Sequence, residues 1–489
     1  MQDAGDNETG EDTSKEIGSP TRRIPALIDR TEPIKDTIFA IYRLAGPIIS
    51  SILVTSLMGL LSLGFAGRYL GSDYLGYVTV SNTLYTVTGF YTGYGMCCAL
   101  DMLSTQEFGR DQESPELGNH LIKAWAVTSV WGGIFTLFWV FSKPLLPFLL
   151  APDAVEPCYQ FLRLTPLMYF PAVWSQAMAK FLQAQHRTRP ITIAALAALA
   201  TSAPLHQLFV PTFGVSGLVM AQGSAFTVQF FVLFHYVKKE CSGTTWRGYN
   251  EESLDDIVPF AWTAVNAMWA TLVEGASFEM TVLTPVIVGL PTNHISANSL
   301  MLSMLFVTFS VQFGISAAAS VLVGNAVGSQ ALIRARFQVV VVMVTAALQG
   351  FLNATAIMVV HPIFFRLFTD DEAVIKIASN HLYAVALSHQ ADILQYTFQG
   401  VCRGFGLFKT ATFVTIVGQW CIAVPLGLFF AGRGGEGIAG AFQGFLIGAC
   451  LECIAFIVRL NPYLDNLTDH HKIKVVKPVV EGEQAATAS

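Results

Sequence analysis

The chain has 489 residues, of which 53% are hydrophobic and only 13% are charged, and its mean hydropathy is positive. Soluble globular proteins carry about 25% charged residues, so this composition excludes a soluble protein and indicates a membrane protein. The net charge of −6 says little about partners, because acidic residues gather in the tail formed by the first 20 residues. That tail has the composition of a disordered segment.

Twelve apolar segments follow the tail, each long enough to cross a bilayer. A spanning segment needs about 20 mostly apolar residues, and its backbone must be helical because lipid offers no hydrogen bonds. We therefore predict an all-α polytopic membrane protein with twelve transmembrane helices. The predicted spans are residues 38–66, 74–100, 119–141, 157–183, 190–210, 215–237, 256–289, 293–322, 335–360, 373–400, 407–431 and 437–460. The seventh is long, so we expect a bend or a break near Gly275 or Pro285.

The basic residues orient these spans. With the N-terminus inside, 21 Lys and Arg residues fall in cytoplasmic segments, against four (Arg68, Lys143, Arg366 and Arg433) on the opposite side. Cytoplasmic loops carry an excess of Lys and Arg, so both termini are predicted to be cytoplasmic. The predicted location is the plasma membrane or the vacuolar membrane.

Short matches between the two halves of the chain indicate an internal repeat. Gly95 and Gly109 in the first half correspond to Gly314 and Gly328 in the second, and both pairs are 14 residues apart. We therefore expect two six-helix bundles related by a pseudo-two-fold axis, as in many transporters. The predicted organisation is an acidic cytoplasmic tail (1–37), an N-terminal bundle (38–240), a cytoplasmic linker (241–255), a C-terminal bundle (256–460) and a cytoplasmic tail (461–489).

Three carboxyl groups lie deep in the predicted second bundle: Glu274 and Glu279 in span seven and Asp392 in span ten. An acidic residue at the middle of a membrane helix costs about 2.5–3.5 kcal/mol on insertion scales, so such residues face a cavity or each other. A carboxyl group removed from water can take up a proton near neutral pH. We predict these groups as coupling-ion sites. On a straight helix Glu274 and Glu279 point about 140° apart.

Polar residues form a stripe along span ten. His389, Asp392, Gln395 or Tyr396, and Gln399 recur at helical spacing. His389 is grouped with the coupling residues, and the others are predicted to line a substrate cavity. Further cavity candidates are Asn82, Gln312, Gln349 and Asn353. The alternative is that the stripe only binds neighbouring helices together, since Gln and His often form such bonds. Asp101 and Arg163 are expected to pair structurally.

Several motifs resemble the multidrug and toxic compound extrusion family, especially its eukaryotic branch. The first half contains Leu44-Ala45-Gly46-Pro47, Phe65-Ala66-Gly67-Arg68 and the acid–Gln–Gly pattern of Asp101, Gln106 and Gly109. The second half contains Gly314-Ile315-Ser316-Ala317-Ala318 and Gly400-Val401-Cys402-Arg403-Gly404. The resemblance covers about residues 38–460. It implies two bundles forming a V, alternating access and efflux driven by inward H⁺ or Na⁺ flow.

At the site, the resemblance agrees with the residues already chosen. Glu274, Glu279 and His389 match positions of animal members, and Asp392 falls where the family keeps an acid. One departure is that Gly275-Ala276-Ser277 stands where the family usually has a Trp soon after the first acid. Span one carries no acid, unlike many bacterial members, which places the predicted coupling site in the second half.

The predicted function is therefore a proton- or sodium-coupled antiporter that exports organic cations, xenobiotics or metabolites. The alternative is a related flippase for lipid-linked or amphipathic substrates, although the deep charges are acids rather than the Lys or Arg that would hold phosphates. No P-loop, nucleophile elbow or paired histidine motif is present, so we predict no enzyme activity and no cofactor. Cys450 and Cys453 have no second cysteine pair, so no metal is expected. The predicted partners are the organic substrate, H⁺ or Na⁺ and the lipid bilayer, without nucleic acid, and the chain is predicted to be a monomer.

Overall fold

The computed structural model describes residues 33–469, and these residues are almost entirely helical. The helices of the first half are α1 (Ile34–Leu70), α2 (Ser72–Tyr85), α3 (Tyr91–Arg110), α4 (Glu116–Val140), α5 (Pro152–Leu162), α6 (Pro166–Ala184), α7 (Arg189–Phe213) and α8 (Val215–Cys241). The second half contains α9 (Ile257–Ile287), α10 (Thr292–Gly328), α11 (Leu332–Arg366), α12 (Glu372–Phe405), α13 (Phe408–Thr415), α14 (Val424–Ala431) and α15 (Ile438–Asp469). Two π-helical segments, η1 (Thr86–Phe90) and η4 (Ile416–Ala423), join α2 to α3 and α13 to α14.

Eight of the helical stretches within residues 33–469 are long and apolar enough to cross a membrane. They are Ile34–Leu70, Glu116–Val140, Arg189–Phe213, Val215–Cys241, Thr292–Gly328, Leu332–Arg366, Phe408–Ala431 and Ile438–Leu464. The other predicted spans, 74–100, 157–183, 256–289 and 373–400, are also largely helical but less apolar. Two of those less apolar helices, α9 and α12, carry the predicted coupling residues, whose polar side chains lower the hydropathy of their helices.

Some predicted boundaries differ from the structure. Predicted span four is divided into α5 and α6, because Pro166 lacks the N–H that would continue the helix. The expected break in span seven is absent, since α9 is helical through Gly275 and Pro285. The last helix continues to Asp469 rather than ending at 460, and there Tyr463 packs edge-on against Phe405. Of the predicted tails (1–37 and 461–489), residues 1–32 and 470–489 lie outside the described residues, whereas 34–37 and 461–469 belong to α1 and α15.

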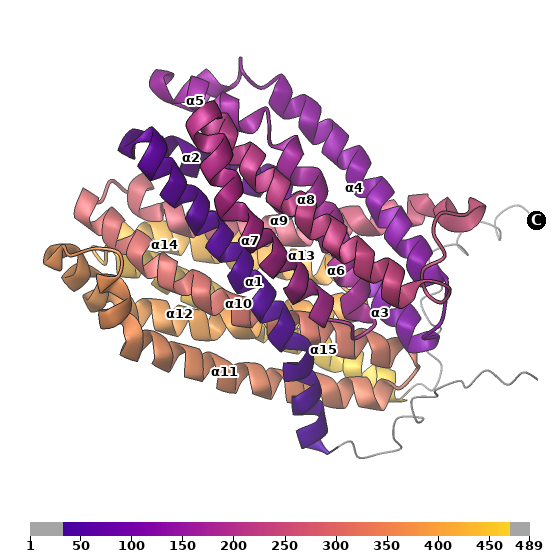
Figure 1. Ribbon diagram of the computed structural model, residues 1–489. Coiled ribbons are helices and arrows are strands. Elements are labelled where there is room, and N and C mark those ends of the chain that lie inside the picture. Colours follow the sequence, from indigo (N-terminus) through magenta and orange to yellow (C-terminus); the bar gives the residue numbers. More distant parts are fainter. Residues whose placement is uncertain (1–32, 470–489) are drawn as a thin grey trace, which may run out of the picture.

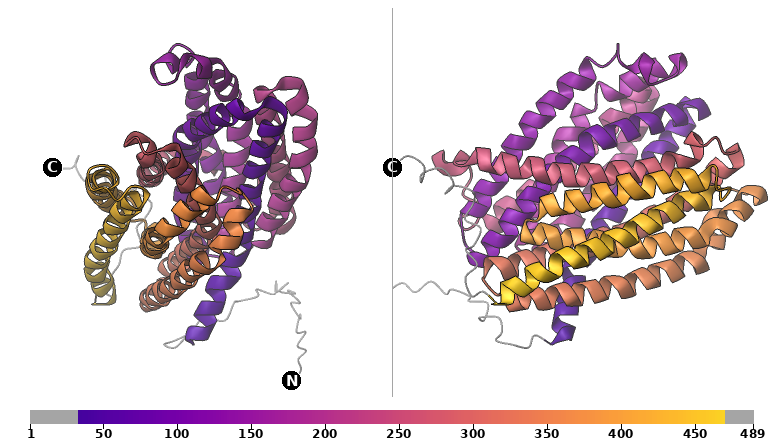
Figure 2. Two further views of the ribbon diagram at one scale, coloured as in Figure 1. Left: turned by 90° about the vertical axis from the view of Figure 1, so that its left-hand side faces the viewer. Right: turned by 180° about the vertical axis from the view of Figure 1, so that it is seen from behind.

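The helices form two groups that approach each other at one end and separate toward the other (Figures 1 and 2). At the approaching end, α3 packs against α9 and α10. Glycines permit this contact, because a Cβ at Gly109 would lie 2.2 Å from the carbonyl oxygen of Asn325, and one at Gly328 would lie 1.8 Å from that of Gln106. The side chain of Gln106 also donates to the carbonyl oxygen of Gly404 at 2.9 Å.

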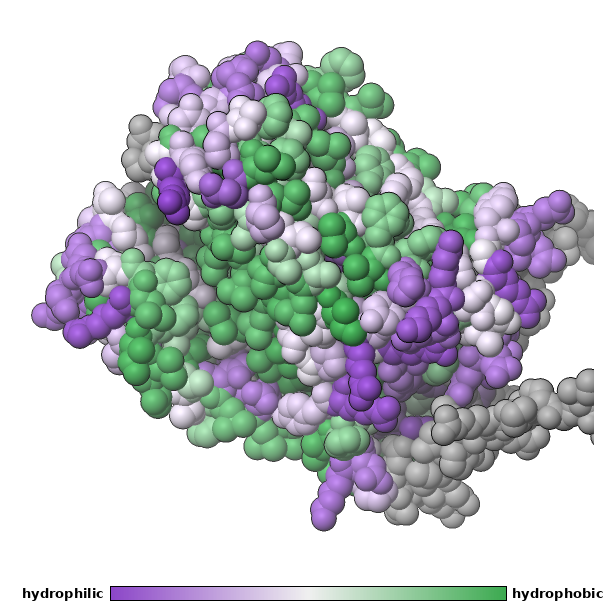
Figure 3. All heavy atoms as spheres, in the orientation of Figure 1, coloured by the Kyte–Doolittle hydropathy of each residue, from purple (hydrophilic) through white to green (hydrophobic). Residues whose placement is uncertain are grey.

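Apolar side chains cover the middle of the visible face, and hydrophilic residues gather toward the helix ends (Figure 3). Exposed residues such as Val130, Phe138, Leu348 and Phe351 are large and apolar. Water would not stabilise so much exposed apolar surface, whereas a bilayer would. The structure is therefore that of a multi-pass membrane protein.

Candidate functional site

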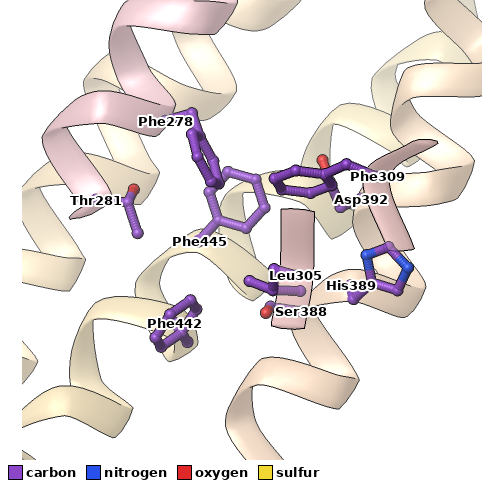
Figure 4. A pocket seen from close by; sticks show the side chains of 9 residues that line it. All are labelled: Phe278, Thr281, Leu305, Phe309, Ser388, His389, Asp392, Phe442 and Phe445. Carbon is purple, nitrogen blue, oxygen red and sulfur yellow. The ribbon is translucent and has the colours of Figure 1, made fainter. Parts of the chain in front are cut away.

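A narrow pocket opens among α9, α10, α12 and α15 in the second half (Figure 4). Its wall is mostly aromatic, with the rings of Phe278 and Phe309 5.0 Å apart between centroids. The polar members come mainly from α12. The full lining is Phe278, Thr281, Leu305, Phe309, Ser388, His389, Asp392, Phe442 and Phe445. Two of the predicted coupling residues, His389 and Asp392, thus share one pocket.

Asp392 is 6% exposed and reaches this pocket from the middle of α12. Its side chain is hydrogen-bonded by Gln312 of α10, which was predicted as a cavity residue. No Lys or Arg lines the pocket. Asp392 is therefore a buried carboxyl group held by an amide rather than neutralised by a basic neighbour.

His389 belongs to a hydrogen-bonded chain across three helices. Its Nε2 lies 3.3 Å from Nδ2 of Asn353, whose Oδ1 accepts from Gln349 at 3.0 Å. The hydroxyl of Tyr42 in α1 then donates to Oε1 of Gln349, also at 3.0 Å. The structure therefore brings the predicted site residues His389, Asn353 and Gln349 together. Their hydrogen bonds connect the pocket to α1.

Glu274 lies beside the polar stripe of α12. Its Oε1 accepts from Nε2 of Gln395 at 3.2 Å, and Gln399 also hydrogen-bonds its side chain. The same nitrogen of Gln395 donates to Oε2 of Glu452 in α15 at 2.8 Å. Glu452 had no role assigned from the sequence, although a charged residue in an apolar helix was a visible signal.

Glu279 faces a different partner, as the helical spacing predicts. Its carboxyl group hydrogen-bonds with the hydroxyl of Tyr91, which lies just after η1 in the first half. The ring of Tyr91 packs on Gly275, where an added Cβ would lie 2.5 Å from a ring carbon. Gly275 thus makes room for an aromatic ring from another helix. The resemblance to the extrusion family implied a Trp close to this position.

Of the remaining predicted residues, Tyr396 and Gln399 are buried on α12, whereas Asn82 lies away from the pocket. Tyr396 is buried next to Phe313, with ring centroids 4.6 Å apart, and the guanidinium of Arg403 lies over its ring. Gln399 is buried and also donates to Thr415 at 3.4 Å. Asn82 is exposed on α2, which packs against α1, α5 and η1 rather than against α12. The structure does not bring Asn82 to the pocket.

The predicted pairing of Asp101 with Arg163 is wrong. Asp101 is fully buried and pairs with Lys180 of α6, with 3.3 Å between Oδ2 and Nζ. The guanidinium of Arg163 instead lies over the ring of Tyr159. Asp101 and Lys180 meet because α3 packs along α6, a contact that spacing within one helix cannot predict.

The arrangement suits reversible cation binding. Within residues 33–469, no group of three or more His, Cys, Asp or Glu residues is placed to hold a metal ion. Carboxyl groups with amide partners can exchange a small cation, and the pocket, with space for about one water molecule, has the size for such an ion rather than for an organic substrate. The aromatic wall of Phe278, Phe309, Phe442 and Phe445 was not anticipated, because isolated phenylalanines in apolar helices give no distinguishing signal.

Comparison with known proteins identifies relatives of this chain. The MatE family model matches residues 47–208 and 276–429, one segment in each half. Protein DETOXIFICATION 16 of Arabidopsis thaliana is 26% identical over 87% of this chain and 88% of its own length. Multidrug and toxin extrusion protein 1 of Homo sapiens is 26% identical over 88% of this chain and 76% of its own length.

A solved structure shares the fold. The crystal structure of the eukaryotic MATE transporter AtDTX14 superposes with a TM-score of 0.81 at 21% identity. The match covers 89% of this chain and 98% of that chain. The all-helical membrane architecture is therefore that of MATE structures.

Proposed function

Because the chain belongs to the MatE family of multidrug and toxin extrusion transporters, we propose that it exports small organic compounds in exchange for H⁺ or Na⁺. The chain is a membrane transporter and not an enzyme. The observation that carries the proposed exchange is the group of interior carboxyls, with buried Asp392 in an aromatic pocket and half-buried Glu274 bonded to the adjacent polar stripe of α12. Each would bind the coupling cation when the site faces one side and release it on the other.

The proposed architecture has twelve spans in two six-helix bundles, residues 38–240 and 256–460, related by a pseudo-two-fold axis. The match of one family model to a segment of each half supports this repeat. The excess of Lys and Arg in alternate loops supports cytoplasmic positions for both tails (1–37 and 461–489) and for the linker 241–255. We place the protein, as a monomer, in the plasma membrane or the vacuolar membrane.

The proposed mechanism is alternating access. The contact of α3 with α10 at Gly109 and Gly328 closes the end that the proposed topology places at the cytoplasm. An exporter must also open that end to take up substrate. The helix pair therefore separates in the other state, while α12 keeps the site residues together. The acidic side chains of the interior favour cationic substrates over the phosphates that a flippase would bind.

Gradient-driven efflux from proteoliposomes tests this function. Vesicles loaded with labelled tetraethylammonium would be diluted into medium that is one pH unit more acidic, or into medium containing Na⁺. The wild-type protein should release the label faster under one of these gradients, and Asp392→Asn and Glu274→Gln should lose that acceleration. Glu436→Gln, at an exposed position before α15, is the matched control. Unchanged gradient-driven efflux in both site variants would refute the coupling role.

A further inference from the structure

Glu452 is an acidic residue in the interior of the second half with no assigned role. It lies on α15, which packs along α12 and η4, and it is only 1% exposed. A charged side chain at such a position is costly unless it is bound or neutralised. Its surroundings therefore show what it binds.

The amide nitrogen of Gln395 joins Glu452 to Glu274. A glutamine amide has two N–H donors, and this one donates to Glu274 at 3.2 Å and to Glu452 at 2.8 Å. Because both bonds end on one nitrogen, the two carboxyl oxygens lie within 6.0 Å of each other. Two negative charges at this separation in a poorly solvated region repel each other strongly, which favours one proton on the pair.

The side chain of Gln419 also hydrogen-bonds the Glu452 carboxyl group. Among residues 33–469, three side-chain oxygens of this cluster still have no hydrogen-bond donor. They are Oε1 of Glu452 itself, Oε1 of Gln395 and Oε1 of Gln419, all in residues that are 1% exposed. Buried polar atoms are nearly always satisfied. A cluster of unpartnered oxygens therefore calls for a positive species, and a proton on Oε1 of Glu452 is the smallest one that supplies a donor.

The backbone around Glu452 is shaped to hold this side chain. A Cβ on Gly418 would lie 2.2 Å from Cγ and 2.7 Å from Oε1 of Glu452. Gly418 belongs to the π-helical segment η4, and such segments often occur at functional sites. Gly418 thus leaves a space that the Glu452 carboxyl group fills.

The ionisable groups that face Glu452 are Glu274 of α9, Asp392 of α12 and Cys453 on its own helix. Among the helices packed against α15, α12 carries buried Arg403 in its last turn, and this guanidinium acts electrostatically on Glu274. Arg334 and Arg336 lie near the start of α11, and Lys409 lies near the start of α13. Arg459 is exposed about two turns beyond Glu452 on α15. Gln395 is the nearest donor.

We propose that Glu452 is a proton-binding carboxyl group that shares one exchangeable proton with Glu274 across the amide of Gln395. The pair carries one proton and one negative charge. Gln395 donates to both carboxyl groups and does not itself carry the proton. This proposal rests on the proposed exchange function and specifies H⁺ as an ion bound at the C-terminal site.

Infrared difference spectroscopy of the purified protein in lipid nanodiscs tests this without transport. A pH titration follows the carbonyl band of protonated carboxyl groups. Glu452→Gln keeps the shape and a hydrogen-bonding group, and it should remove one buried titrating band and displace that of Glu274. Gly418→Ala should displace the Glu452 band without removing any ionisable group. Glu436→Gln should change only a solvent-exposed carboxyl signal.

The results separate the two proposals. A Glu452→Gln spectrum whose buried bands match the wild type, in protein that elutes as a folded monodisperse species, overturns the shared proton. Glu452→Gln should lose the acceleration of efflux that a one-unit pH gradient supplies, a loss of up to about tenfold, because one pH unit is a tenfold proton ratio. If the wild type shows no gradient-driven efflux, the exchange function fails, whatever the spectra show.

Discussion

The buried ion pair of Asp101 and Lys180 joins α3 to α6 inside the first half. Both side chains are almost inaccessible, and the Lys180 ammonium also lies 5.5 Å from the ring centroid of Tyr94. Such pairs add little net stability over apolar residues, but removing one partner leaves an uncompensated buried charge. Removing one partner should therefore destabilise the protein much more than replacing both partners with apolar residues.

Asp101→Asn should destabilise the protein by about 3–5 kcal/mol, because Lys180 would lose its counter-ion in a buried position. The double variant Asp101→Leu with Lys180→Met should recover most of that loss. Thermal unfolding in detergent, followed by size-exclusion chromatography, measures both. A double variant that is less stable than the single one would contradict this account.

Buried Tyr85 and half-buried Tyr91 offer a comparison. The hydroxyl of Tyr91 binds Glu279, whereas the hydroxyl of Tyr85 is buried without a partner among residues 33–469. Tyr91→Phe should cost about 0.5–1.5 kcal/mol, the usual net value of one hydrogen bond. Tyr85→Phe should be neutral or stabilising. Equal melting temperatures for the two variants would argue against the Tyr91–Glu279 bond.

For single residues, the sequence predicts which polar side chains lie deep in the membrane helices, but not which partner each one has. Asp392 and His389 were identified because ionisable groups are rare in membrane helices. Their shared pocket also needs Phe278 and Phe445, which arrive from α9 and α15. The bridge from Glu274 to Glu452 depends on the packing of α9, α12 and α15, and no pattern within a single helix contains that information.

Among the elements, the crossing of α3 and α10 is the tightest contact between the two halves. Gly109, Gly324 and Gly328 lie so close to the opposite backbone or side chains that a Cβ would come within 2.2 Å of another atom. Glycine is required here for close approach rather than for backbone conformation. The repeated glycine spacing in the sequence therefore marks a contact surface.

Gly328→Ala should force α3 and α10 apart at this end, because its Cβ would collide with the carbonyl oxygen of Gln106. Overpacking of this kind costs about 1–3 kcal/mol. A cysteine introduced at Thr105, which is fully buried, should then react faster with a water-soluble maleimide. Gly59→Ala in α1 is the control, since nothing lies within 4 Å of its Cβ. Equal labelling rates in the two backgrounds would contradict a closed contact.

The positions of most helices follow from hydropathy, but their internal irregularities do not. Residues 407–431 were predicted as one span and contain α13, η4 and α14. Within η4, the glycine at 418 leaves the space that Glu452 of α15 occupies, which is a tertiary requirement. By contrast, the division of α5 from α6 is local, because Pro166 was a visible breaker.

In the whole molecule, the N-terminal part of each half's first helix packs into the opposite half, while the rest of that helix packs on its own half. Ile41, Leu44 and Ala45 of α1 belong to an apolar cluster formed mainly by α10, α11, α12 and α15. Phe260, Ala264, Ala267 and Met268 of α9 belong to the cluster formed by the first half. Each half thus completes the core of the other, although the sequence repeat indicates two similar units.

This reciprocal packing predicts that neither half is stable alone. A fragment ending at residue 250 would expose the α1 surface that packs on the second half, and a fragment starting at 251 would expose the corresponding surface of α9. Each fragment expressed alone should aggregate or be degraded, whereas co-expressed fragments should form a complex that elutes like the intact chain. The cut lies between α8 and the short 3₁₀ helix η3 (Glu251–Leu254) and interrupts no helix. Fluorescent tags on each fragment allow both elution profiles to be read from one membrane extract. A monodisperse folded fragment in the absence of its partner would show that the interlocked first helices are dispensable for the stability of each half.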